Sequence, residues 1–157
     1  MAAPPAWVMQ AFAKLPGPAQ QRAQALLVRV MKDQYLPALA TVPAAWLLVY
    51  VPHFVKFGLM LRQRKSEYNN VTPRSEDPDA YGEAAGVIKR AIACHMNGFE
   101  SFSAFVAAVV LCKIQKAKPM KVAALCFKYL LWRALFTAFY LAGGNRPTAA
   151  LRSLSWF

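Results

Sequence analysis

The chain has 157 residues, 57% of them hydrophobic, and a formal net charge of +12. Its length suits one domain, and its apolar residues gather in long runs, which excludes the even pattern of an ordinary soluble globule. A basic chain can bind nucleic acid, but most basic residues here stand at the ends of apolar runs, where Lys and Arg reach anionic lipid headgroups. We therefore expect membrane lipids as partners and no nucleic acid; the same charge would also suit acidic partner subunits.

Residues 1–35 are predicted to form a basic N-terminal arm. The arm is rich in Ala and Pro and carries four basic residues but one acid, Asp33. Residues 20–31 predict an amphipathic helix, whose apolar face consists of Ala23, Leu26, Leu27 and Val30. Such a start is typical of organelle transit sequences, and it is equally typical of a helix that lies on the membrane surface.

Three apolar runs follow the arm, at residues 36–61, 87–112 and 122–142. Each has about 20 residues or more, enough to cross a hydrocarbon core of about 30 Å. A polar loop separates the first two runs, and a Lys-rich turn at 113–121 joins the second to the third. Pro43 and Pro52 are expected to kink or break the first span.

A short fourth helix is expected after the third run. Gly143 and Gly144 end that run, and Pro147 stands where it can open a new helix. About ten residues follow, too few to cross a bilayer. The predicted fold is all-α, an integral membrane antiparallel helical bundle at residues 36–157 with three full spans and a short remnant of a fourth. A soluble bundle of buried helices is the alternative.

Cysteine and histidine spacing gives no signature of a disulfide framework or a metal site. The three cysteines, Cys94, Cys112 and Cys126, all lie in predicted spans and form no CxxC pair. The two histidines, His53 and His95, lie on different spans without ligand-like spacing. We therefore expect no metal.

Polar residues interrupt the second and third spans. Arg90, Asn97 and Glu100 are separated by seven and three residues, which predicts one helical stripe. Ionisable groups inside a bilayer mark a functional site by default. On the third span Arg133 and Tyr140 share a face, and Arg152 opens the last helix.

Antiparallel packing brings these six residues to similar depth. The planar guanidinium of arginine, with its paired N–H donors, suits a ligand that carries carboxylates. An arginine near a thiol favours the thiolate form of that thiol. The structural alternative is that Arg133 pairs with Glu100 inside the bundle, Asn97 bridges helices and Arg152 contacts headgroups.

Three segments in this order resemble the MAPEG family (membrane-associated proteins in eicosanoid and glutathione metabolism). The segment EDPDAYGEAAGVIKRAIACHMNGFESFSAF is similar to the family's RAxRAHxNxxExxP motif, WRALFTAFYL is similar to its third-helix segment, and LRSLSWF is similar to the opening of its fourth helix. The resemblance implies antiparallel transmembrane helices, commonly assembled as a trimer, with glutathione bound between protomers.

By matching position, the resemblance implies a glutathione-contacting set of six residues: Arg90, Asn97, Glu100, Arg133, Tyr140 and Arg152. It also implies that Arg133 or Arg152 stabilises a thiolate, which makes these two the catalytic candidates.

Several features depart from the family pattern. Ala93 stands where the second motif arginine belongs, Ser103 or Ala104 stands near the usual proline, and the fourth helix is short. The basic arm is an addition. These departures favour a catalytically degenerate accessory subunit of a larger membrane complex, such as a respiratory complex of the mitochondrial inner membrane. The alternative is an active homotrimer in the endoplasmic reticulum, a glutathione-dependent transferase or peroxidase acting on lipophilic electrophiles.

Overall fold

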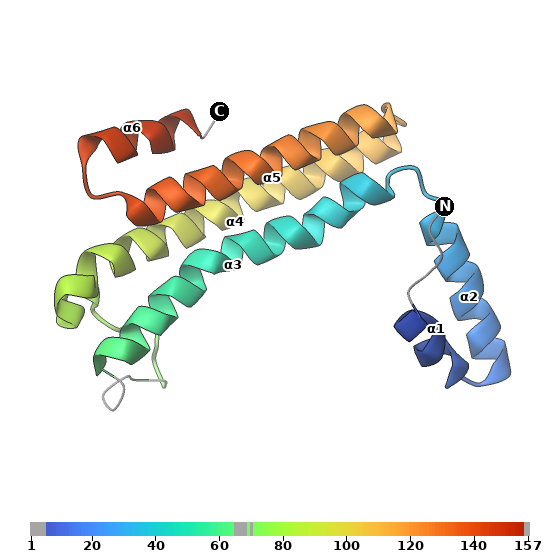
Figure 1. Ribbon diagram of the computed structural model, residues 1–157, viewed down its shortest axis with the longest axis horizontal. Helices are drawn as coiled ribbons and strands as arrows, with labels where there is room; N and C mark the ends of the chain where they lie inside the picture. The colour runs from blue at the N-terminus through green and yellow to red at the C-terminus, as the bar shows by residue number, and fades with distance from the viewer. Residues whose placement is uncertain (1–5, 65–68, 70, 156–157) are drawn as a thin grey trace.

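The computed structural model describes residues 6–64, 69 and 71–155, and every regular element among them is a helix. Three helices are long and apolar enough to cross a membrane: α3 (Leu36–Arg64), α4 (Ala85–Ile114) and α5 (Pro119–Ala142). They lie side by side and alternate in direction, as Figure 1 shows. The predicted all-α antiparallel membrane bundle is therefore confirmed.

Helix α3 is continuous through both of its internal prolines, so the expected break is wrong, while the expected kink stays a prediction. A proline removes one backbone donor from the helix ladder, and for Pro52 the carbonyl that loses its donor belongs to Leu48, four residues earlier. Near Pro52, Nδ1 of His95 on α4 lies 2.8 Å from the Val49 carbonyl oxygen. This contact ties the proline-containing part of α3 to α4.

Small residues allow α3 and α4 to pack closely. A Cβ atom built on Gly98 of α4 would lie 3.1 Å from Cγ1 of Val49 on α3. Towards the α4–α5 turn, Phe105 stacks on Tyr129 with ring centroids 4.0 Å apart. At the opposite end, the buried ring of Tyr81 packs with Met60. The core thus runs along the whole bundle.

Two shorter helices lie at the end of the bundle opposite the α4–α5 turn. The 3₁₀ helix η1 (Pro78–Ala84) leads directly into α4, and the Asp77 carboxylate caps it by accepting from the backbone N–H of Asp79. Helix α6 (Arg146–Leu154) follows the third span and folds back along α5 (Figure 1). Its nine residues match the predicted short fourth helix.

The N-terminal arm contains α1 (Ala6–Ala13) and α2 (Gly17–Met31). Helix α2 begins three residues before the predicted start at residue 20 and ends where predicted. An ion pair between Asp33 and Lys113 and a hydrogen bond from the Tyr35 hydroxyl to the Ala117 carbonyl join the arm to the α4–α5 turn. The arm therefore lies at the turn end of the bundle.

Candidate functional site

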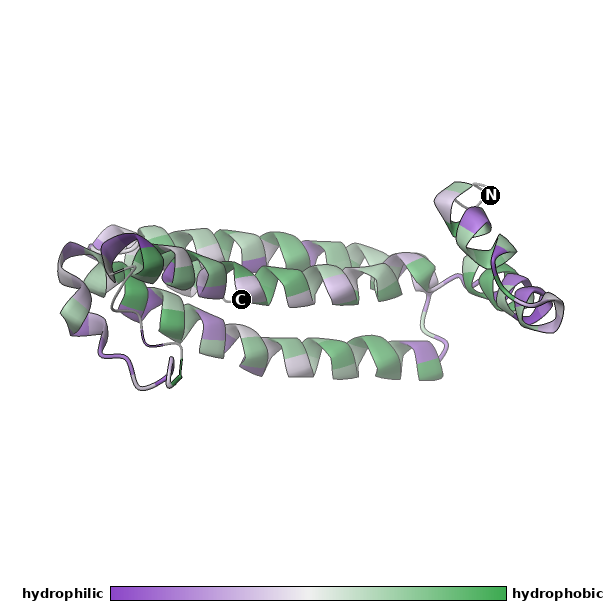
Figure 2. Ribbon diagram, turned by 90° about the horizontal axis from the view of Figure 1, so that it is seen from below, coloured by the Kyte–Doolittle hydropathy of each residue, from purple (hydrophilic) through white to green (hydrophobic). Residues whose placement is uncertain are grey.

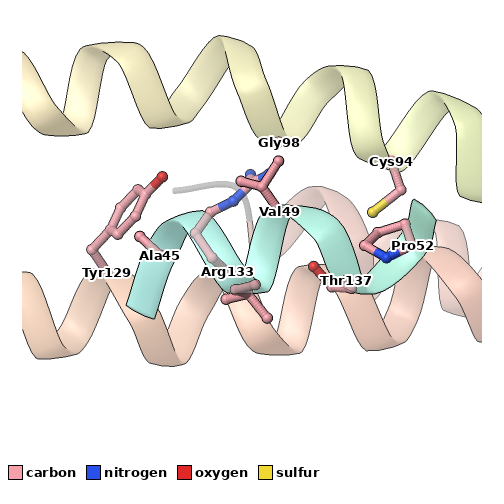
Figure 3. A pocket seen from close by; sticks show the side chains of 9 residues that line it. Ala45, Val49, Pro52, Cys94, Gly98, Tyr129, Arg133 and Thr137 are labelled. Carbon is pink, nitrogen blue, oxygen red and sulfur yellow. The ribbon is translucent and has the colours of Figure 1, made fainter. Parts of the chain in front are cut away.

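Arg133 of α5 points between the long helices and is 8% exposed. Its guanidinium donates to Oδ1 of Asn97 on α4 over 3.1 Å and lies 4.3 Å from the centroid of the Phe136 ring. Figure 3 shows the side chain directed towards the α4 backbone at Gly98. The structure thus brings two of the six predicted site residues, Asn97 and Arg133, into direct contact.

A small internal cavity lies beside Arg133 (Figure 3). Its volume is about 10 Å³, close to the smallest space that holds one water molecule. The cavity is lined by Ala45, Leu48, Val49, Pro52, Cys94, Gly98, Tyr129, Arg133 and Thr137. Within a single copy of the chain this cavity is too small for a peptide ligand.

Sequence reasoning missed two polar neighbours of Arg133. Thr137 lies one helical turn after Arg133 and lines the cavity together with Cys94. Tyr129 lies one turn before and donates from its hydroxyl to Oγ of Ser101 over 3.3 Å. Their spacing in the sequence could have predicted both neighbours, because residues four apart on a helix share a face.

A second group of predicted residues lies in an open cleft between α5, α6 and the start of α4. The cleft has a volume of about 440 Å³. Nε and one terminal nitrogen of Arg90 each donate to the Leu141 carbonyl over 3.4 Å, and the Arg152 guanidinium lies 4.7 Å from the centroid of the Tyr140 ring. The structure thus brings three of the six predicted site residues, Arg90, Tyr140 and Arg152, into one cleft.

The cleft also contains Arg146, which the sequence analysis did not select. Its lining therefore includes three arginines, and no acid is among the described residues that line it. The Asn145 side chain caps α6 by accepting from the backbone N–H of Thr148 over 3.0 Å. An anionic group fits this cleft, since arginine binds carboxylates through paired donors.

Glu100 does not join either group. Its side chain is exposed on α4, and no hydrogen bond or ion pair joins it to another residue in the described part of the chain. The alternative in which Arg133 pairs with Glu100 is therefore wrong within one copy, because Asn97 is the group that accepts from Arg133. The residues of the predicted stripe therefore do not share one environment: Asn97 contacts α5, whereas Glu100 lies on the outer face of α4.

The structure also brings together the two histidines. The ring centroids of His53 and His95 are 5.2 Å apart, and Tyr50 packs edge-on against His95 at 5.3 Å. Among the described residues, no group of three or more His, Cys, Asp or Glu side chains could hold a metal ion. The histidine pair is part of an aromatic contact between α3 and α4.

Comparison with known proteins identifies one family. The model of the MAPEG family matches residues 38–157, which include all the long helices except the first two residues of α3. No curated protein and no solved structure matches the chain. The family match begins after the N-terminal arm, so the arm lies outside the matched region.

Proposed function

The chain belongs to the MAPEG family, and from this premise we propose that it is a catalytically degenerate member that serves as an accessory subunit of a larger complex in the mitochondrial inner membrane. The observation that carries the proposal is the outward-facing Glu100. It stands near the middle of the 30-residue helix α4, on a face exposed in a single copy. A charge at the centre of a bilayer costs about 2.5–3.5 kcal/mol on insertion scales, so Glu100 favours a neighbouring protein within the membrane.

Two features favour an accessory subunit over an enzyme. Ala93 stands where the resemblance to the family expects an arginine, which leaves one cation fewer to bind an anionic ligand. Arg133, one of the two catalytic candidates, is buried against Asn97 and Phe136 beside a cavity of about 10 Å³. A guanidinium held in this way is a structural contact between α4 and α5.

The basic N-terminal arm supports the mitochondrial location in this proposal. Its described helices carry no acid, and α2 has Arg22 and Arg29 along one side. Basic amphipathic segments of this kind are typical of mitochondrial targeting sequences. Localisation to the endoplasmic reticulum would contradict this part of the proposal.

Gentle detergent extraction followed by native gel separation and mass spectrometry tests the accessory role. We expect co-migration with other subunits at fixed stoichiometry. Glu100→Gln should weaken this association, because the substitution removes a charge that the neighbouring protein pairs, whereas Ser103→Ala on the exposed surface of the same helix should not. A band of three copies without foreign subunits would contradict the proposal.

The arginine-lined cleft favours a second candidate function, a glutathione-dependent transferase or peroxidase acting on lipophilic electrophiles. Arg90, Arg146 and Arg152 supply donors for the two carboxylates of glutathione, and Tyr140 supplies a hydroxyl. In this case a homotrimer would bring Glu100 of one copy to a neighbouring copy. Glutathione would supply the thiol nucleophile, and Arg133 or Arg152 would favour its thiolate form.

Calorimetric titration of the purified chain with glutathione distinguishes the two functions. The enzyme predicts binding that weakens strongly in Arg133→Ala and Glu100→Ala, with Arg74→Ala in the distant loop as a matched control. The accessory role predicts no binding in the wild-type chain. Binding that neither substitution alters would contradict the six-residue site.

A further inference from the structure

The N-terminal arm is directed across the bundle. Helix α2 runs at a steep angle to α3, α4 and α5 in Figure 1, and Figure 2 shows the arm beyond the end of the bundle. The Asp33–Lys113 ion pair and the Tyr35 hydroxyl, which donates to the Ala117 carbonyl, hold the start of α3 against the α4–α5 turn. Because the three long helices cross the membrane, a helix held across their ends lies along the membrane surface.

The charges at this end of the molecule are almost all positive. The arm and the α4–α5 turn together contain eight basic residues: Lys14, Arg22, Arg29, Lys32, Lys113, Lys116, Lys118 and Lys121. The one acid in these two segments, Asp33, is paired with Lys113. At the opposite end, by contrast, the segment before α4 contains Glu76, Asp77, Asp79 and Glu83. Basic residues also stand at the opposite end, among them the arginines of the cleft, but these acids partly offset them. The excess of positive charge is therefore larger at the arm end, and it favours an anionic surface there.

Apolar side chains accompany these charges on the arm. Leu26 and Val30 of α2 are 62% and 43% exposed, and Trp7 of α1 is 72% exposed. Leu26 lies four residues after Arg22 and three before Arg29, so the leucine is next to both arginines on the helix surface. Exposed apolar side chains flanked by arginines are typical of helices at the boundary between headgroups and acyl chains.

A hollow at the end of α2 adds a place for a headgroup. It is lined by Ala25, Val28, Arg29, Lys32 and Asp33. Arg29 and Lys32 supply phosphate donors, while the Asp33 carboxylate is neutralised by its partner Lys113.

We propose that the α1–α2 arm is a membrane-surface element that binds anionic phospholipids in the leaflet at the α4–α5 turn. Arg22, Arg29 and Lys32 bind the phosphates, and Leu26 and Val30 enter the acyl boundary. This arm is separate from the arginine-lined cleft and from the six predicted site residues. The proposal therefore holds whether the chain is an accessory subunit or an enzyme.

Hydrogen exchange on the full chain, reconstituted in nanodiscs, tests the proposal. One set of discs contains phosphatidylcholine alone, and in the other a third of the lipid is phosphatidylglycerol. We expect amide exchange across Gly17–Met31 to be slower by about tenfold in the anionic discs and the difference to shrink at high salt.

Matched variants separate charge from apolar contact. Arg22→Gln with Arg29→Gln should abolish the difference between the two lipids, whereas Arg62→Gln with Arg74→Gln, which removes two charges at the opposite end, should preserve it. Leu26→Gln with Val30→Gln should speed exchange in both discs.

Two outcomes would overturn the proposal. One is equal exchange across α2 in neutral and anionic discs for the wild-type chain. The other is exchange that remains fast in both discs and slows only when an acidic partner protein is added, which would assign the arm to a protein.

Discussion

Removing the acceptor of Arg133 should destabilise the bundle measurably. In the wild-type chain, Asn97 Oδ1 accepts from the guanidinium over 3.1 Å, and Arg133 is 8% exposed. Asn97→Ala removes this acceptor from a charged and buried donor. Hydrogen bonds to charged groups contribute about 1.5–3 kcal/mol in soluble proteins, whereas interhelical pairs in membranes average about 0.6 and reach about 1.7 kcal/mol. Because this donor is charged and buried, we expect a loss near the upper membrane value, about 1.5 kcal/mol.

Thermal unfolding in detergent measures this loss. For a chain of this size, 1 kcal/mol corresponds to about 2–4 °C, so the expected decrease in Tm is about 3–6 °C. Asn97→Asp retains an acceptor and should be at least as stable as wild type above the pKa of the new carboxyl. Met96→Ala is the matched control, because Met96 is the preceding residue on α4 and is 61% exposed. An Asn97→Ala variant as stable as the Met96→Ala variant would refute the structural role of this contact.

Further predictions concern packing, pH and the outer face. Gly98→Leu should overpack the α3–α4 contact and cost about 1–3 kcal/mol, since even a Cβ would lie 3.1 Å from Val49. Val49→Ala should partly restore the Tm of Gly98→Leu. The hydrogen bond from Lys113 lowers the pKa of Asp33 below its ordinary value of 3.8. The pairing therefore stabilises the arm above about pH 4 and is lost as the pH falls through the lowered pKa. A spin-label distance between α2 and the α4–α5 turn should lengthen in that range, and Asp33→Asn should show the long distance at neutral pH. Glu100→Gln should leave the Tm of the isolated chain unchanged, because Glu100 is exposed there; a lower Tm would show that its carboxylate has a partner within one copy.

The features of the fold that depend on local sequence spacing, namely the spans and the helix ends, were predicted well. The lengths of the apolar runs predict the three spans, and the glycine pair followed by Pro147 predicts the end of α5 and the start of α6. Arg133, Tyr140 and Arg152 were selected as functional candidates because polar groups in apolar helices are expensive; their functional role stays a prediction. Their grouping around two separate sites was not predicted.

The position of Glu100 shows where spacing alone was insufficient. A helix turns by about 100° per residue, so Glu100 stands about 60° around the helix from Asn97. Because of that rotation, Asn97 lies between α4 and α5 whereas Glu100 lies on the outer face. Packing contacts such as that of Gly98 with Val49 determine which side of α4 the other helices cover. Spacing within one helix carries no information about this rotation.

By itself, the sequence determined the membrane class, the number of spans and the basic, amphipathic character of the arm, because each depends on composition and period within one segment. The tertiary structure alone decided that Arg133 bonds to Asn97, that the two histidine rings meet, and that α2 lies across the end of the bundle. These features join segments far apart in the chain. They depend on helix rotation and depth, which are set by the packing of side chains between helices.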